Sequence, residues 1–147
     1  MGSSTRTGRC LCGAVRFAFE AAKHGVDACH CGMCRRWTGG PFLGLAHDGA
    51  VSFEGPEHIG VYKSSAWAER AFCRLCGTSL YWRITGTQEY SFAAGTLDDQ
   101  SALELTTEIF IDEKPAYYAF ANETRKLTGE EAMSGLSGRQ IDDTRDD

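Results

Sequence analysis

Hydrophobic positions alternate with polar ones over short runs of the chain, which is the pattern of half-buried β-strands. Three runs show it most clearly, each with its apolar side chains on one face. They are Val15, Phe17 and Phe19; Leu80, Trp82 and Ile84; and Leu103, Leu105, Thr107, Ile109 and Ile111. Between the runs lie many of the seventeen glycines, which favour tight turns because they adopt positive φ without steric cost. The pattern predicts a mainly β fold of several small antiparallel sheets.

Two short stretches carry the only helical signals. Residues 33–38 and residues 128–134 could each form a turn or two of helix. After Phe120 the chain has no aromatic residue and no cysteine, and 11 of its last 27 residues are charged. Chain ends of this kind are commonly frayed. We therefore expect one domain over residues 1–120, with little helix, and a charged, partly disordered tail over residues 121–147.

The composition narrows the classes of function. Of the 147 residues, 42% are apolar and 24% are charged, as is typical of globular proteins. The formal net charge of -5, with no basic run beyond Arg35 and Arg36, argues against binding to nucleic acid. No stretch has the length and apolarity of a signal peptide or a membrane span. We expect a cytoplasmic protein that binds neither nucleic acid nor membrane.

Seven cysteines fall into three clusters. An odd number would leave one cysteine over in a disulfide framework, and a reducing cytosol disfavours disulfides, so metal ligation is the better explanation. The clusters are Cys10-Leu11-Cys12-Gly13, Cys29-His30-Cys31-Gly32-Met33-Cys34 and Cys73-Arg74-Leu75-Cys76-Gly77. In each, a glycine follows the second cysteine, where a chain that presents two thiolates to one ion must turn sharply. This repetition predicts zinc knuckles.

Neither inert burial nor redox chemistry accounts for the cysteines as well as metal ligation does. Buried cysteines can be small, inert hydrophobic residues, but such residues would not recur at these spacings with a glycine each time. A redox pair of the thioredoxin type would open a helix, whereas the residues around Cys73 and Cys76 look like a strand, a turn and a strand.

Seven ligands divide most naturally into four and three. Only the middle cluster has three cysteines of its own: Cys29, Cys31 and Cys34. A zinc site with three protein ligands keeps an open position, as catalytic sites do. The remaining two clusters would share a closed structural site, a pairing that spacing alone leaves open: Cys10, Cys12, Cys73 and Cys76. The chain is thus expected to bind two zinc ions.

Four segments give the chain a specific resemblance. They are GRCLCGAVRF (8–17), ACHCGMCRRWTGG (28–40), FCRLCGTSL (72–80) and AGTLDD (94–99). From about residue 8 to residue 120, the chain resembles the glutathione-dependent formaldehyde-activating enzyme (GFA) family, which includes centromere protein V. The resemblance implies small packed β-sheets, a structural zinc at the four cysteines of the closed site and a catalytic zinc at the three of the open site.

The chain departs from the family late in the domain. Where the family usually has His-Ile-Phe, this chain has Glu108-Ile109-Phe110, and where a Trp follows it has Tyr117 or Tyr118. These departures leave the expected zinc ligands unchanged and bear on the substrate.

Residues that follow the open cluster are candidates for its chemistry. Arg35 and Arg36 come directly after Cys34 and could meet an anionic group of a substrate or stabilise charge that develops beside the metal. The simpler alternative is a pair of solvated charges. Trp37 could form a wall of a pocket or belong to the core.

Three further residues have simpler roles than catalysis. His30 could complete the open cluster, but neighbours in an extended knuckle point to opposite sides, so it should face away from the ion. Asp98 and Asp99 resemble a catalytic pair, yet a turn after a strand favours Asp for hydrogen bonds to backbone N–H groups. We expect His30 outside the ligand set and the aspartates in a turn.

The resemblance and the open cluster together indicate an enzyme of carbon–sulfur bond chemistry. A zinc-bound thiol such as glutathione is deprotonated and would add to a small aldehyde such as formaldehyde; the reverse reaction would be that of a lyase. The alternative is a non-catalytic, zinc-stabilised protein-binding module, since a fold does not fix a function. The open site favours the enzyme, with zinc as cofactor and a small-molecule thiol and aldehyde as substrates.

Overall fold

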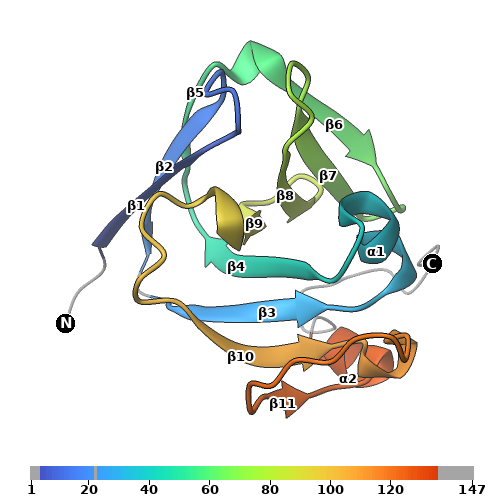
Figure 1. Cartoon of the computed structure of the whole chain (residues 1–147). Coiled ribbons are helices and arrows are strands. Elements are labelled where there is room, and N and C mark those ends of the chain that lie inside the picture. The colour runs from blue at the N-terminus through green and yellow to red at the C-terminus, as the bar shows by residue number, and fades with distance from the viewer. Residues whose placement is uncertain (1–3, 22, 136–147) are drawn as a thin grey trace.

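The computed structural model describes residues 4–21 and 23–135, which form eleven strands, three 3-10 turns and two short helices (Figure 1). The strands are β1 (Ser4–Arg9), β2 (Arg16–Ala21), β3 (Gly25–Cys29), β4 (Phe42–Asp48), β5 (Ser52–Glu54), β6 (Ile59–Lys63), β7 (Ala68–Cys73), β8 (Ser79–Ile84), β9 (Glu89–Ala93), β10 (Glu104–Ile109) and β11 (Arg125–Lys126). The turns and helices are η1 (Pro56–His58), η2 (Ala94–Thr96), η3 (Ile111–Glu113), α1 (Gly32–Thr38) and α2 (Gly129–Ser134). The mainly β class with little helix is confirmed.

The strands form two sheets instead of several small ones. The larger has the order β11-β10-β3-β4-β9-β8-β7-β6, and the smaller has the order β1-β2-β5. β10 pairs in parallel with both β3 and β11, whereas the other pairs are antiparallel. A parallel pair of strands needs a long connection, and six strands separate β3 from β10 along the chain. Local turn signals in the sequence therefore do not reveal this pairing.

The main core lies between the two sheets. Val15, Phe17 and Phe19 are all buried there, so their shared face is confirmed. The rings of Phe17 and Phe19 both stack on the ring of Phe92 in β9. Their centroids lie 4.6 Å and 4.7 Å, respectively, from the centroid of Phe92. These contacts hold the small sheet against one face of the large sheet and leave the opposite face free to form a site.

A β-bulge changes the expected face of β8. Ala71 of β7 pairs with Tyr81, but the next residue, Phe72, pairs with Ser79, so Leu80 is the extra residue. A bulge turns consecutive side chains to one side. Leu80 therefore packs in the core with Tyr81, while Trp82 and Ile84 lie on the other face.

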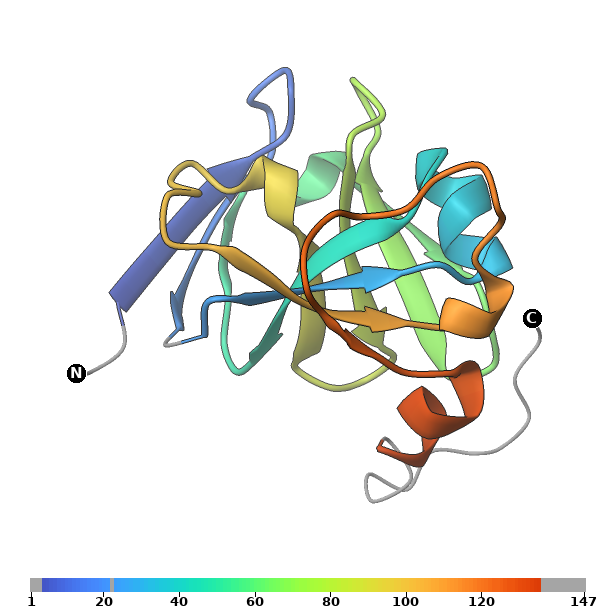
Figure 2. The ribbon, with the colours of Figure 1, turned by 60° about the horizontal axis from the view of Figure 1, so that its bottom comes forward.

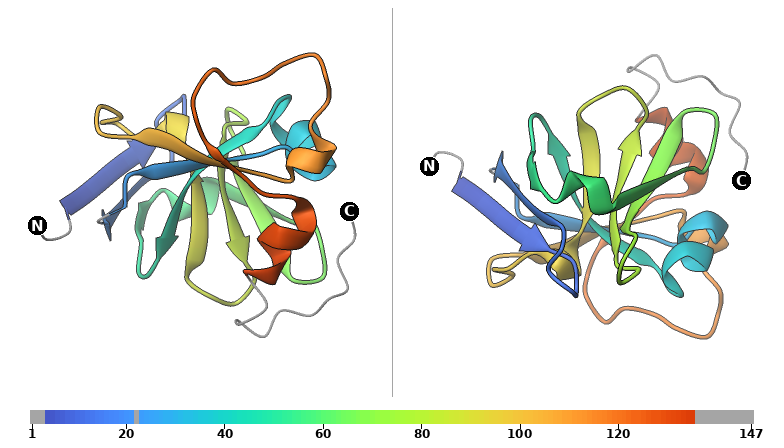
Figure 3. Two further views of the ribbon diagram at one scale, coloured as in Figure 1. Left: turned by 90° about the horizontal axis from the view of Figure 1, so that it is seen from below. Right: turned by 90° about the horizontal axis from the view of Figure 1, so that it is seen from above.

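The chain after residue 120 adds to the large sheet. β11 pairs with β10, and α2 packs Ala132 and Met133 against a second apolar cluster around α1. Both helices lie at one end of the molecule and the small sheet lies at the other (Figures 2 and 3). The remainder of the expected tail, residues 136–147, falls outside the described residues. None of the helices in the described ranges is long and apolar enough to cross a membrane.

Candidate functional site

One group of sulfur atoms joins two turns that are far apart in the sequence. Cys10 and Cys12 lie in the turn after β1, Cys73 ends β7, and Cys76 lies in the turn that follows. All four sulfur atoms are within 4.8 Å of one another, and we call this group the four-cysteine cluster. The pairing of the first and third sequence clusters, which spacing left open, is the one that the fold brings together.

The backbone of both turns suits sulfur ligands. Gly13 and Gly77, which follow the second cysteine of each turn, have φ of 81° and 84°. A side chain would be strained at such angles, so the glycines permit the sharp turn. The backbone N–H of Leu75 points at Cys73 Sγ, 3.4 Å away, which is a contact that stabilises a thiolate.

The sulfur spacing fits a tetrahedral metal ion. With metal–sulfur bonds of about 2.3 Å, a tetrahedral zinc site places its sulfur atoms about 3.8 Å apart. Cys12 Sγ lies 3.7 Å from Cys10 Sγ and 3.9 Å from Cys73 Sγ. All seven cysteines are free thiols rather than disulfides. The four-cysteine cluster could therefore hold a metal ion with every position filled by protein.

The second group of sulfur atoms lies where β3 meets α1. Cys29 ends β3, Cys31 is the N-cap of α1, and Cys34 lies in the first helical turn. Their sulfur atoms are within 4.8 Å of one another, and we call them the three-cysteine cluster. Cys31 Sγ accepts the N–H of Cys34 at 3.4 Å, so the helix start fixes the directions of both sulfur atoms. Gly32 begins the helix here and does not form the positive-φ turn expected after the second cysteine.

The pKa values of the three buried thiols are shifted in different directions. Hydrogen bonds from Cys29 and Cys34 lower the pKa of Cys31 to about 2. Hydrogen bonds to Cys31 and Cys34 raise the pKa of Cys29 well above its usual range. The pKa of Cys34 is raised to about 11, because its contact with Cys29, which lowers it, is outweighed by its contact with Cys31 and by burial. Near neutral pH the cluster thus holds one thiolate and two thiols, and a metal ion would displace two protons.

His30 points away from the cluster, as the alternation of side chains predicts. Its ring is fully buried, with Nε2 2.8 Å from Glu108 Oε1 and Nδ1 2.8 Å from the hydroxyl of Tyr118. Glu108 also accepts a hydrogen bond of 2.6 Å from the hydroxyl of Thr124. Both ring nitrogens are therefore occupied, and within the described residues the cluster has three metal-binding side chains. Glu108 and Tyr118, two positions at which the chain departs from the GFA pattern, thus both contact His30.

A cavity of about 550 Å³ opens beside the three-cysteine cluster, and all three cysteines lie in its wall. This volume is in the range of pockets that hold small molecules. The wall is built by strands β3, β4, β7, β8, β9, β10 and β11 together with α1 and α2. Apolar side chains in the wall include Phe42, Trp67, Trp82, Ile109 and Met133, and polar ones include Asp27, His47, Arg70, Thr107 and Glu131. A ligand in this cavity can reach the sulfur atoms.

Arg70 is the cation that the fold brings to the cluster. It lies on β7 with 6% of its surface exposed, and its Nη2 donates to Cys34 Sγ at 3.3 Å. Nη1 donates to the hydroxyl of Ser64 at 2.6 Å, and the guanidinium lies over the ring of Trp37, 5.3 Å from its centroid. No local pattern in the sequence indicates this residue, because it is 36 positions from Cys34 along the chain.

Arg35 and Arg36 are not among the residues of the cavity wall. Arg35 Nε donates to the carbonyl oxygen of His30 at 2.9 Å and so closes the turn before α1, while Arg36 is exposed. Trp37 stacks on Phe42, with centroids 5.1 Å apart, and belongs to the packing of α1 against β4. The structure thus brings Arg70, rather than the adjacent pair, into contact with the sulfur atoms.

Asp98 and Asp99 lie in the loop before the turn that leads to β10, away from the cysteine clusters. Asp98 Oδ2 accepts from the hydroxyl of Thr7 at 2.7 Å, and Asp99 Oδ1 accepts from the backbone N–H of Ser101 at 3.0 Å. The second bond is the local contact for which turns favour aspartate.

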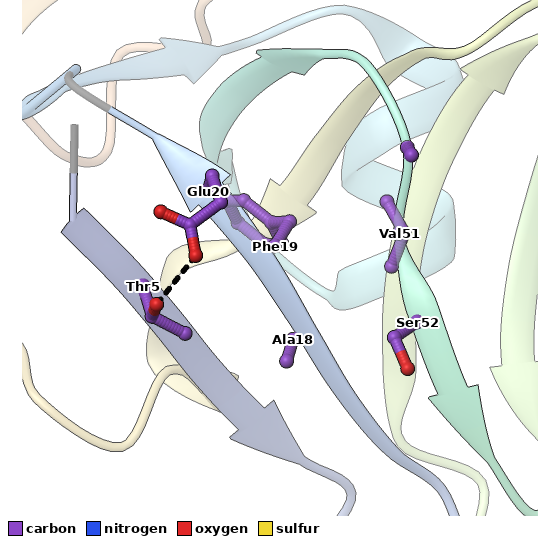
Figure 4. A pocket seen from close by; sticks show the side chains of 7 residues that line it. Thr5, Ala18, Phe19, Glu20, Val51 and Ser52 are labelled. Atoms are coloured by element: carbon purple, nitrogen blue, oxygen red, sulfur yellow. Dashed lines mark hydrogen bonds between the residues drawn. The ribbon is translucent and has the colours of Figure 1, made fainter.

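A second, smaller hollow lies on the small sheet (Figure 4). Its volume is about 330 Å³, and its wall is formed by Thr5, Ala18, Phe19, Glu20, Ala50, Val51 and Ser52. Glu20, its one charged side chain, accepts a hydrogen bond of 2.6 Å from Thr5. None of the cysteines lines it, so the cavity at the three-cysteine cluster is the candidate site.

Comparisons with known proteins bear on this site. Residues 5–113, which contain every cysteine, match the family described as glutathione-dependent formaldehyde-activating enzyme. An uncharacterized lyase of Schizosaccharomyces pombe is 35% identical over 130 residues, covering 88% of this chain and 95% of that protein. A Halomonas elongata protein, provisionally named as a glutathione-dependent formaldehyde-activating enzyme, is 30% identical over 83 residues, covering 50% of this chain and 53% of that protein.

The fold has a counterpart among solved structures. A crystal structure of a Rhodobacter sphaeroides protein superposes with a TM-score of 0.55 and 24% identity, over 63% of this chain and 87% of that one. At this identity the likeness concerns the fold alone.

Proposed function

Because the chain belongs to the glutathione-dependent formaldehyde-activating enzyme family, we propose that it is a zinc-dependent carbon–sulfur lyase. It would join a glutathione-like thiol to a small aldehyde such as formaldehyde, or catalyse the reverse reaction. The observation that carries the proposal is the three-cysteine cluster in the wall of a cavity. Among the described residues, no fourth metal-binding side chain joins this cluster. The names of the relatives in Schizosaccharomyces pombe and Halomonas elongata support the same class.

The number of cysteines in the open cluster supports this proposal. Cys29, Cys31 and Cys34 would hold the zinc ion, and the ion would supply an open position that lowers the pKa of a thiol bound there. In the synthetic direction a sulfur–carbon bond forms, the π bond of the aldehyde carbonyl breaks, and the thiol's proton ends on the new hydroxyl group. The buried contacts of His30 hold the backbone between Cys29 and Cys31 in place, which would keep the sulfur atoms directed at the cavity.

The four-cysteine cluster has a different proposed role. Four thiolates complete the coordination of zinc and leave no position for a substrate, as in structural sites. We therefore assign two zinc ions to each chain, one structural and one catalytic. If the open cluster bound no thiol, a non-catalytic binding module would be the better explanation.

Equilibrium exchange tests this function. In a mixture of glutathione and ¹³C-formaldehyde, carbon exchange spectroscopy measures the rate at which the labelled carbon passes between the free hydrate and the sulfur adduct. The zinc-loaded protein should raise this rate in proportion to its concentration, and Cys34→Ser should remove the increase. An unchanged exchange rate with the two-zinc protein would contradict the proposal.

A further inference from the structure

Arg70 is a buried cation without a carboxylate partner. Its neighbour on β7, Glu69, pairs with Arg83 at 2.8 Å, and within the described residues no carboxylate forms an ion pair with Arg70. Its Nε is buried and also has no acceptor there. A buried charge is costly unless an opposite charge lies close to it. The ionisable group that Arg70 does contact is Cys34, so the cluster is the source of the missing negative charge.

The guanidinium is held rigidly in this position. Side chains alternate along β7, so Arg70 lies on the cavity face while Ala71 faces the core. The hydroxyl of Ser64 fixes Nη1, and the ring of Trp37 covers the guanidinium. A rigid, planar cation can distinguish ligands by charge without moving.

The charge of the site depends on its fourth ligand. Three thiolates and one divalent ion carry a single negative charge, which Arg70 balances. A neutral fourth ligand, such as water or imidazole, leaves this balance unchanged. An anionic thiolate adds a second negative charge, and without Arg70 that charge would lie beside buried cysteines whose site is already negative.

We propose that Arg70 is a specificity-determining residue, which makes the open position of the three-cysteine cluster favour an anionic thiolate over a neutral ligand. The inference rests on the proposed function, because it requires a metal ion at the cluster and a thiol as its ligand. It assigns to Arg70 the electrostatic role that sequence adjacency assigned to Arg35 and Arg36.

Ligand binding to the cobalt-loaded protein tests this inference. Cobalt(II) replaces zinc at thiolate sites, and its visible spectrum reports a change of the fourth ligand. We would titrate 2-mercaptoethanol and, separately, imidazole into wild type, Arg70→Met, Arg70→Gln, Arg70→Lys and the control Lys63→Met, which removes a positive charge from an exposed position on β6. Arg70→Gln keeps a donor for Ser64, so it serves if Arg70→Met fails to fold.

The ratio of the two affinities decides the outcome. Arg70→Met and Arg70→Gln should weaken thiol binding at least tenfold and leave imidazole binding within about twofold, while Arg70→Lys and Lys63→Met should keep the wild-type ratio. A merely structural role would weaken both ligands alike, and that result, or an unchanged ratio, would overturn the inference while leaving the proposed function intact. If wild type bound imidazole but no thiol, both would be overturned.

Discussion

The direction in which each side chain of this site points follows from the alternation of side chains along extended backbone. Cys29 and Cys31 turn their sulfur atoms toward the cavity, while His30 between them turns to Glu108 on the opposite side. The same rule places Arg70 beside Cys34. One local rule thus separates the residues that face the cavity from those that point away from it.

The affinity of the three-cysteine cluster for zinc should depend steeply on pH. In the metal-free protein near pH 7, Cys31 is ionised because its pKa is lowered to about 2, whereas Cys29 and Cys34 retain their protons because their pKa values are raised. Binding then releases two protons, so the affinity should rise about 100-fold for each pH unit between about pH 6 and 8. Competition with a chelator for the second equivalent of zinc measures this slope. A dependence of tenfold per unit or less would contradict the charge distribution described for the cluster.

The residues at the site were only partly predictable from the sequence. The cysteines could be grouped because their spacing and the following glycines are local signals. Arg70 could not be found in this way, because its contact with Cys34 depends on the position of β7 relative to α1. Adjacency in the sequence pointed to Arg35 and Arg36 instead, but a helix directs neighbouring residues to different sides.

Two short elements complete the cavity, and both begin with a side-chain cap. Cys31 caps α1, and Thr128 caps α2 through a capping box with Glu131. These helices were predicted at residues 33–38 and 128–134 and are confirmed within one residue at their starts. Their signals are local. The parallel pair of β3 and β10 was not predictable, because it depends on contacts across the intervening strands.

Removing the cap of α2 should loosen one wall of the cavity. Thr128 Oγ1 accepts the N–H of Glu131 at 3.1 Å, and the carboxylate of Glu131 accepts the N–H of Thr128 at 2.8 Å. Thr128→Ala should cost about 1 kcal/mol of local stability. Hydrogen–deuterium exchange should therefore accelerate about fivefold over residues 129–134 and remain unchanged in β3.

A variant on the small sheet provides the control for this experiment. Thr5→Ala removes a comparable hydrogen bond to Glu20 and should leave exchange in α2 unchanged. Equal exchange of α2 in Thr128→Ala and wild type would show that the capping box does not stabilise this wall.

At the scale of the whole molecule, the four-cysteine cluster connects the two sheets. Cys10 and Cys12 follow β1 of the small sheet, and Cys73 ends β7 of the large sheet, 61 positions from Cys12. A metal ion here would close a long loop and contribute its binding energy to folding. The three-cysteine cluster, in contrast, joins adjacent elements of the chain.

The two clusters should therefore differ in their effect on stability. Cys76→Ser should prevent folding or lower the melting temperature by more than about 15 °C, because the proposed structural ion would lose a ligand. Cys34→Ser should lower it by less than about 5 °C. Thermal unfolding followed by circular dichroism measures both values, and equal decreases would contradict the division into a structural and a functional ion.

Native mass spectrometry with glutathione tests the central claim most directly, namely that the three-cysteine cluster holds a metal ion with a free position for a thiol. Wild type should carry two zinc ions and bind one glutathione, whereas Cys34→Ser should carry one zinc ion and bind none. Wild type with a single zinc ion, or equal glutathione binding by wild type and Cys34→Ser, would contradict the claim.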